Sequence, residues 1–292
     1  MDIEQRNKMI AELKTACPEY ANLSQLYFMG SGEEAEKNLE KAMKAYARVQ
    51  RDETPLACFG SDLEGFVLTT KRIYIKDNDS NTGCSLPEEI VDVRKGTIEN
   101  TLMQTLLSRI LIFTPHHAKP YIITTPDHAE AIKLLLAWKD MVIDPEKKSN
   151  SENQFTRCAG DWGFTTRWML TGRRFTEVYA NQDMLSIEQY KQFIFSFGRQ
   201  QNTIDLKNVT SVVREKKIAS SSVYLIILGL VSLVAFVGII PLLIGLFTLR
   251  EKRIKIVSPN GAVNIPDMPS DGQMNDLLEY IRERKPNAVQ IM

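Results

Sequence analysis

The sequence has few of the residues that build metal sites and disulfide frameworks. It holds four cysteines, which are far apart and form no Cys-x-x-Cys pair, and only three histidines. Structural zinc sites and disulfide-stapled domains both need such residues at close spacing. Four unpaired thiols are also typical of a reducing compartment. We therefore expect no metal ion and no cofactor.

A net charge is absent too, because 36 Lys and Arg residues balance 36 Asp and Glu residues. Proteins that bind nucleic acid usually carry a basic surplus, so we expect no nucleic-acid partner. The stretch 158–179 mixes Trp, Phe and Arg in a way that could grip nucleic acid by stacking. Its alternation favours two core strands joined by a turn instead.

Enzyme motifs are also missing. The chain has no Gly-x-Ser-x-Gly, no phosphate-binding loop and no Gly-x-Gly-x-x-Gly. The adjacent His116 and His117 fall in a predicted turn, where neighbouring side chains point apart and make a poor metal pair. We therefore expect a protein that is not an enzyme.

What is present is a change of periodicity along the chain. Residues 4–16 and 33–49 carry apolar side chains at helical spacing. From Pro55 onward, short segments rich in β-branched and aromatic residues alternate with turn residues, as in antiparallel sheets. A helix then opens at Asp127, a suitable N-cap. Its predicted buried face comprises Ala131, Leu134, Leu135, Trp138 and Met141.

The second half of the chain repeats the order of the first. The segment Arg109–Pro115, "RILIFTP", aligns with Arg253–Pro259, "RIKIVSP", and each is followed by a turn, an extended segment and a helical segment. This pattern predicts an internal duplication. The predicted parts are a helical N-terminal hairpin over 1–50, a first β domain over 52–145, a linker over 146–153, a second β domain over 154–285 and a tail over 286–292.

One hydrophobic run, residues 223–249, interrupts the second β domain. As one helix it would be roughly 40 Å long, enough to span the roughly 30 Å hydrocarbon core of a bilayer. As two helices bent near Gly238 and Pro241 it would form a re-entrant hairpin. A third alternative is the buried core of a soluble domain. The residues expected to be inserted in the membrane are Val223, Leu228, Gly229, Phe236, Gly238, Pro241, Gly245 and Leu249.

Basic residues flank both ends of this run. They are Arg214, Lys216, Lys217, Arg250, Lys252, Arg253 and Lys255. A single span normally has one flank rich in Lys and Arg and one flank with few of them. Equal flanks and the duplication favour a hairpin whose ends lie at one anionic surface. The seven bases are therefore candidate contacts to anionic lipid, although they would equally serve as topology determinants and solvated strand ends.

The segments "GFVLTTKRIYIKD", "SLPEEIVDV" and "KRIKIVSPNGAVNI", with the helix around Trp138, resemble bacterial pleckstrin-homology-like (PH-like) domains, some of which carry an inserted hydrophobic hairpin. The resemblance implies two small bent sheets, each closed by a C-terminal helix, and a binding role rather than catalysis. The loop that resembles the phosphoinositide site of PH domains carries Asp62 and Glu64 and no base. That ligand is therefore not carried over to the first domain.

The predicted fold class is α+β, with two PH-like antiparallel β domains each closed by a C-terminal helix, a helical N-terminal hairpin and a membrane-inserted hydrophobic segment. The predicted function is a non-enzymatic binding or scaffold protein, anchored at the cell membrane with its bulk in the cytoplasm. Its expected partners are the lipid bilayer and an unidentified protein or a second copy.

Two other functions remain open at this point. One is an accessory subunit of a membrane transport or secretion complex, in which Gly229, Gly238 and Gly245 would allow close approach to partner helices. The other is an enzyme of unrecognised class.

Overall fold

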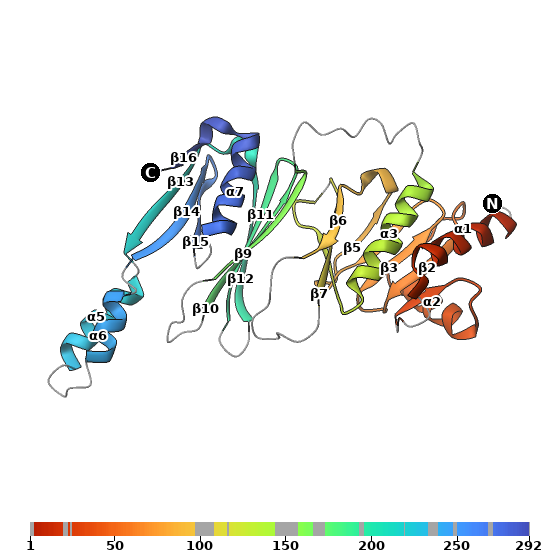
Figure 1. The fold of residues 1–292 in the computed structure, drawn as a ribbon, viewed down its shortest axis with the longest axis horizontal. Coiled ribbons are helices and arrows are strands. Elements are labelled where there is room, and N and C mark those ends of the chain that lie inside the picture. Colours follow the sequence, from red (N-terminus) through yellow and green to blue (C-terminus); the bar gives the residue numbers. More distant parts are fainter. Residues whose placement is uncertain are drawn as a thin grey trace. The chain divides into compact units, whose positions relative to one another are not determined.

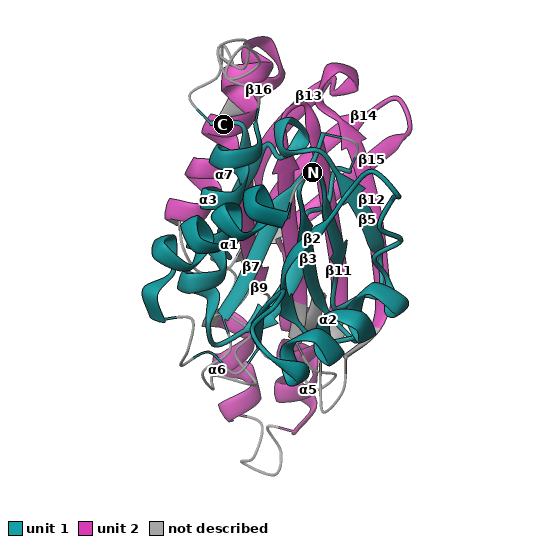
Figure 2. Ribbon diagram, turned by 90° about the vertical axis from the view of Figure 1, so that its right-hand side faces the viewer, with its two compact units in different colours: residues 1–159 teal, residues 160–292 magenta. Residues whose placement is uncertain are grey.

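The computed structural model shows a mixed α+β protein with four β-sheets (Figure 1). It describes residues 3–19, 23, 25–96, 108–115, 117–143, 157–165, 173–192, 196–218, 220–232, 239–247, 250–267 and 271–291. The chain divides into unit 1, residues 1–159, and unit 2, residues 160–292 (Figure 2).

Unit 1 contains a five-stranded antiparallel sheet in the order β1-β2-β3-β4-β5. Its strands are β1 Leu26–Phe28, β2 Pro55–Gly60, β3 Gly65–Thr69, β4 Ile73–Lys76 and β5 Thr82–Ser85. Side chains alternate between the two faces of a strand. Phe66 and Leu68 of β3 therefore enter the main core of unit 1, whereas Val67 between them enters a second cluster on the other face. Because both faces are covered, β3 is buried along its whole length.

A 3-10 turn, η2 Pro87–Glu89, leads to a three-stranded antiparallel sheet of β6 Asp92–Lys95, β7 Ser108–Phe113 and β8 Tyr121–Thr125. Helix α3, His128–Val142, follows and packs on the main core. The predicted helix face is confirmed for Ala131, Leu134, Leu135 and Trp138, which are buried. Asp127 occupies the N-cap position, although its side chain makes no capping hydrogen bond.

The predicted N-terminal helical hairpin is wrong. Helices α1 Ile3–Ala16 and α2 Glu33–Ala45 are separated by β1, which pairs with β2 as the edge of the sheet. Ile10 and Leu13 of α1 join the main core, and Leu39 and Ala42 of α2 join the second cluster. The two helices are therefore parts of unit 1 rather than an element in front of it.

Unit 2 has two four-stranded sheets. The first, in the order β12-β11-β10-β9, contains β9 Ala159–Thr165, β10 Arg173–Asn181, β11 Met184–Gln192 and β12 Ser196–Asp205. The 3-10 turn η3, Leu206–Asn208, separates it from the second, in the order β15-β14-β13-β16. That sheet contains β13 Ser211–Ile218, β14 Arg250–Ser258, β15 Gly261–Asp267 and β16 Val289–Ile291.

Helix α7, Asp271–Arg284, closes the core of unit 2. The indole N–H of Trp162 donates to Asp276 Oδ2 at 2.7 Å. The carbonyl of Gln182, in the β10–β11 turn, accepts from Tyr280 Oη at 2.8 Å and from Arg284 Nε at 2.7 Å. These bonds fix the helix along its length to the first sheet of the unit.

The predicted tail over 286–292 is also wrong for its described part. The 3-10 turn η5, Pro286–Ala288, leads into β16, which pairs with β13 in parallel from Val212↔Val289 to Arg214↔Ile291. Ala288 is buried in the core of the unit. This end of the chain therefore extends the second sheet.

Both units show the same succession: four strands in a meander, a 3-10 turn, three strands and a helix. The aligned segments beginning at Arg109 and Arg253 lie on β7 and β14, the middle strands of the two three-strand meanders. Between β13 and β14, unit 2 holds two further helices, α5 Ser220–Ser232 and α6 Ile239–Phe247.

The predicted fold class is wrong in the form in which the sequence suggested it. In the described residues each unit contains two sheets rather than one bent sheet, with a 3-10 turn between the two meanders. Among the described residues, no helix is long and apolar enough to cross a membrane. The described parts of α5 and α6, 13 and nine residues, extend about 20 Å and about 14 Å, against roughly 30 Å of hydrocarbon. The predicted transmembrane helix and the membrane-spanning form of the inserted segment are therefore wrong.

Candidate functional site

Helices α5 and α6, called here the apolar hairpin, are inserted at the end of a paired strand ribbon. Strands β13 and β14 pair without interruption from Ser211↔Val257 to Ile218↔Arg250. The segment between Ile218 and Arg250 contains no charged residue. Because Ile218 and Arg250 are paired, the chain leaves the sheet and returns to it at the same point.

Two glycines hold the helices of the apolar hairpin together. A Cβ atom on Gly229 would lie 2.5 Å from the backbone nitrogen of Leu242. A Cβ on Gly245 would lie 2.7 Å from Ile226 Cγ1. Both glycines are buried and face the other helix of the same hairpin. Their small size therefore serves contact within the hairpin, whereas the sequence suggested contact with partner helices.

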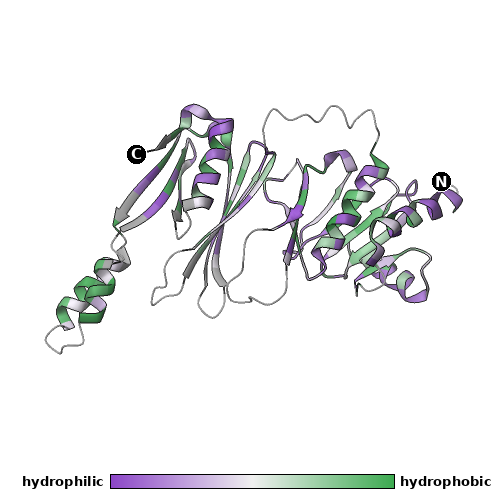
Figure 3. Ribbon diagram, in the orientation of Figure 1, coloured by the Kyte–Doolittle hydropathy of each residue, from purple (hydrophilic) through white to green (hydrophobic). Residues whose placement is uncertain are grey.

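Most exposed large hydrophobic side chains of the described chain lie on the apolar hairpin, which Figure 3 shows as a hydrophobic projection of unit 2. Val231 and Ile240 are 72% and 68% exposed. The full set on these two helices is Val223, Tyr224, Ile227, Leu228, Leu230, Val231, Ile239, Ile240, Leu243, Ile244 and Leu246. A contiguous exposed apolar surface of this kind usually marks a contact with a partner or a membrane.

The predicted membrane-inserted residues fall into four groups. Val223 and Leu228 are exposed on α5, and Gly229 and Gly245 lie between the helices. Pro241 is half-buried near the start of α6, where a missing N–H is tolerated. Phe236, Gly238 and Leu249 lie outside the described residues.

The seven predicted lipid-contacting bases lie on the two strands that carry the apolar hairpin, and we call them the basic collar. Arg214, Lys216 and Lys217 are on β13; Arg250, Lys252, Arg253 and Lys255 are on β14. Arg253 forms an ion pair with Glu215 on the opposite strand. Arg214 Nη1 donates to Asn275 Oδ1 of α7 at 3.2 Å. All seven bases therefore lie on the two strands that lead into and out of the apolar hairpin.

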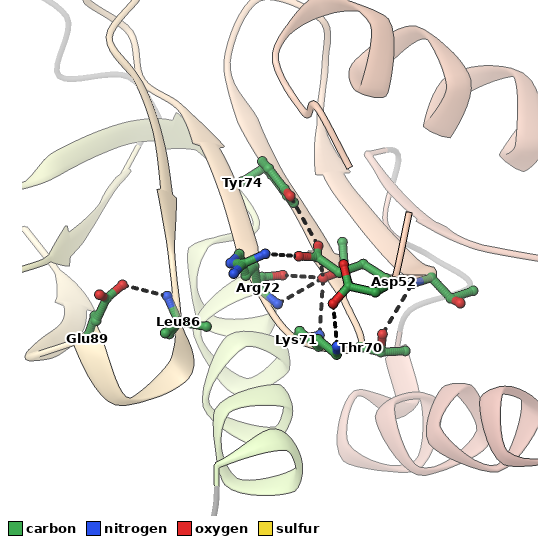
Figure 4. Close-up of polar contacts among 10 residues, drawn as sticks. Asp52, Thr70, Lys71, Arg72, Tyr74, Leu86 and Glu89 are labelled. Carbon is green, nitrogen blue, oxygen red and sulfur yellow. Dashed lines mark hydrogen bonds and ion pairs between the residues drawn. The ribbon is translucent and has the colours of Figure 1, made fainter. Parts of the chain in front are cut away.

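A polar cluster in unit 1 was not predicted (Figure 4). The buried carboxylate of Glu53 accepts from Thr69 Oγ1 at 3.0 Å and from Tyr74 Oη at 3.1 Å, and it pairs with Arg72. Thr69 Oγ1 also accepts from the backbone N–H of Arg72 at 2.9 Å. Burial and the nearby Cys84 and Glu53 raise the pKa of Tyr74. The cluster fastens the β3–β4 turn, because every group contacts the turn or its strands.

Other polar and aromatic groups of the described chain are also bound within the protein. The carboxylate of Glu64 accepts from the backbone N–H of Thr124 at 3.1 Å, and burial raises its pKa. Burial raises the pKa of Cys58 to about 12, so this thiol stays protonated. Trp162 and Phe164 are core residues of unit 2, as the alternation predicted. Trp168 lies outside the described residues.

No model of a known protein family matches the chain, and no curated protein matches it. These comparisons therefore give no support to the PH-like domains that the resemblance suggested. The arrangement of the apolar hairpin and the basic collar is the strongest guide to function that the described residues provide.

Proposed function

We propose that the protein is a non-enzymatic binding protein that attaches to a membrane from one side through the apolar hairpin, without crossing it. Its two units would then be held at the cytoplasmic face of the cell membrane as a scaffold. The observation that carries this proposal is the concentration of exposed apolar side chains on two helices that begin and end at one sheet.

The size of the exposed apolar surface is sufficient for attachment. Fully burying a Val, Leu or Ile side chain stabilises by about 1.5–3 kcal/mol, and these side chains are roughly half exposed in the free protein. About ten of them would therefore contribute on the order of 10 kcal/mol before losses from immobilisation and from backbone groups at the tip. This gross value leaves a margin for stable attachment.

The geometry also favours approach from one side. The helices are apolar around most of their surface, yet the described part of each is shorter than the hydrocarbon core. Both ends of the apolar hairpin are held by the paired strands β13 and β14. A hairpin of this form can enter hydrocarbon and return, while the charged strands remain outside.

Replacement of residues 219–249 by Asn-Gly tests this function. Since Ile218 and Arg250 are paired, a two-residue turn can close the β13–β14 ribbon in their place. We expect the shortened protein to fold, with cooperative unfolding of both units, and to move from the membrane pellet to the supernatant. A full-length variant in which Ile227, Val231 and Ile240 are changed to Ser should also move from the membrane pellet toward the supernatant.

Two outcomes would contradict the proposal. Retention of the shortened protein in the membrane fraction would show that attachment lies elsewhere. Failure of the purified full-length protein to bind vesicles, together with recovery of a stoichiometric membrane protein after gentle solubilisation, would support the accessory-subunit alternative instead.

A further inference from the structure

Helices α5 and α6 run antiparallel, and two close contacts fix which residues lie beside each other. A Cβ atom on Gly229 would meet the backbone nitrogen of Leu242, and a Cβ on Gly245 would meet the backbone nitrogen of Ile226. A step forward along α5 therefore matches an equal step back along α6. This register ranks the described residues of the apolar hairpin by their distance from the sheet.

The ranking gives the apolar hairpin a near end and a far end. Both helices continue past the ends of β13 and β14, so the start of α5 is the near end (Figure 1). Tyr224 belongs to this near end. Val231 of α5 lies level with Ile240 of α6 at the far end of the described parts. With a rise of 1.5 Å per residue, Tyr224 precedes Val231 by about 10 Å along the helix.

Hydrogen-bonding side chains are confined to the near end. Beyond Tyr224, the described parts of α5 and α6 contain one polar side chain, that of Ser232. Its hydroxyl donates to the carbonyl of Leu228 one turn earlier, so it needs no partner outside the helix. Tyr224, by contrast, is 74% exposed. The polarity of the apolar hairpin therefore changes along its length and not from one face to another.

This distribution decides how the apolar hairpin can meet a bilayer. A helix that lies in the plane of the headgroups needs a polar face toward water. Exposed apolar side chains lie on both helices, among them Leu228 and Val231 on α5 and Ile240 and Leu243 on α6, and residues 219–249 contain no charge. The apolar hairpin therefore suits end-on entry, with its far end in the hydrocarbon.

The depth of such an entry follows from the position of Tyr224. A tyrosine ring has an apolar body and a polar tip, and such rings favour the headgroup level of a membrane. Val231 would then lie about 10 Å deeper than Tyr224. One leaflet provides about 15 Å of hydrocarbon, half of the roughly 30 Å core. The described far end therefore fits within the nearer leaflet.

We propose that the apolar hairpin enters the bilayer end-on, with Val231 and Ile240 at equal depth in the hydrocarbon of the nearer leaflet. Tyr224 is the positioning residue that stays at the headgroup level and sets this depth. The inference rests on the proposed function, because it requires attachment through the apolar hairpin. It adds the part of the lipid that each end of the hairpin contacts.

Depth-dependent fluorescence quenching of the vesicle-bound, full-length protein tests the inference. The vesicles contain equal parts of phosphatidylcholine and phosphatidylglycerol, with bromine on the acyl chains either near the headgroup or near the chain end. The reporters are Tyr224→Trp, Val231→Trp and Ile240→Trp, and the wild type supplies the background from its own tryptophans. We expect chain-end bromine to quench Val231→Trp and Ile240→Trp most strongly and equally. Bromine near the headgroup should quench Tyr224→Trp most strongly.

The positioning role of Tyr224 has its own test in the Val231→Trp protein. Tyr224→Leu removes the polar tip that favours the headgroups, so the reporter should move deeper and its quenching should shift toward chain-end bromine. Ile227→Leu is the matched control, because it changes an exposed side chain in the next turn without changing its polarity. Equal shifts in the two variants, or no shift with Tyr224→Leu, would overturn the role of Tyr224.

The remaining outcomes separate this inference from the function on which it rests. If the three reporters lie at one depth, the apolar hairpin lies flat on the membrane, so end-on entry is wrong while attachment stands. Unequal depths for Val231→Trp and Ile240→Trp would likewise overturn the proposed orientation. If the wild-type protein does not bind the vesicles, or binds them with no reporter quenched, the proposed function fails and the inference fails with it.

Discussion

In unit 1 both faces of the five-stranded sheet are covered by helices, whereas unit 2 carries much of its apolar surface on helices that extend beyond its sheet. Helices α1 and α3 cover one face of the first sheet through the main core, and α2 covers the other through a second cluster. In unit 2 the apolar hairpin contributes no residue to the described core clusters. With the same succession of strands and helix, unit 1 buries its hydrophobic helices against the sheet, whereas unit 2 holds two hydrophobic helices outside its described core.

A segment can therefore be strongly hydrophobic and still contribute little to the stability of the folded protein. Most large side chains on the described helices of the most apolar stretch are exposed, while the short strand β3 is completely buried. Substitutions in covered regions should therefore change the free energy of unfolding. Substitutions in the apolar hairpin should change attachment and leave that free energy nearly unaltered.

The largest expected effect is that of Trp138→Ala in unit 1. Trp138 is fully buried, and its indole N–H donates to the Thr69 carbonyl at 2.7 Å. Loss of the ring and of this bond should lower the free energy of unfolding of unit 1 by about 3–5 kcal/mol. Denaturant unfolding measures the change, and Ile240→Ser in the apolar hairpin is the control expected to leave the midpoint in place. Equal shifts of the unfolding midpoint in both variants would show that covered and exposed apolar residues contribute equally to stability, which would contradict the prediction.

Glu53→Ala should have the next largest effect. It removes the buried acceptor shared by Thr69, Arg72 and Tyr74, and leaves polar groups without their partner. A buried polar group without its partner typically costs about 1–3 kcal/mol, so the free energy of unfolding of unit 1 should fall by about 2 kcal/mol. Asp52→Ala is the matched control, because its ion pair with Lys71 is exposed and should contribute little. A larger loss for Asp52→Ala than for Glu53→Ala would contradict the role of the buried cluster.

How far the sequence could predict this structure depends on how local each feature is. Helix α3 was predictable with its buried face, because its apolar residues keep one period over four turns. The Glu53 cluster was not, because its partners lie 16 to 21 residues away and only strand pairing brings them together. The β1 strand between two helices was missed because three residues carry too little pattern to be recognised.

The apolar run shows the same limit in another form. The run is long enough that one continuous helix would span a bilayer, but the sequence alone does not show whether it forms one helix. Among the described residues, which include α5 Ser220–Ser232 and α6 Ile239–Phe247, no helix is long and apolar enough to cross a membrane. The basic flanks were visible in the sequence, whereas the pairing of the strands that carry them required the register of β13 with β14.

Gly229→Leu should act locally within the apolar hairpin. The new side chain has no room against Leu242, so the two helices must separate. We expect amide hydrogen exchange in α5 and α6 to accelerate several-fold, while the core strands of unit 2 keep their protection. Leu230→Ala, at an exposed neighbouring position, is the control and should leave exchange in both helices unchanged. Acceleration throughout unit 2 would show that the hairpin is part of its cooperative core.

The smallest expected effect concerns pH and lies in the covered region. Burial raises the pKa of Glu64 in the folded protein above its ordinary value of 4.5. The folded state then binds this proton more tightly than the unfolded state, so the associated stability is full below about pH 4.5 and is lost as pH rises through the raised pKa. Glu64→Gln keeps an oxygen to accept from the Thr124 N–H and removes the titration. The free energy of unfolding of unit 1 should therefore fall less between pH 4.5 and neutrality in the variant than in the wild type. If the free energy of unfolding changes with pH in the same way in both proteins, burial of this carboxyl has no energetic consequence. The two units would then differ only in how they use their apolar residues.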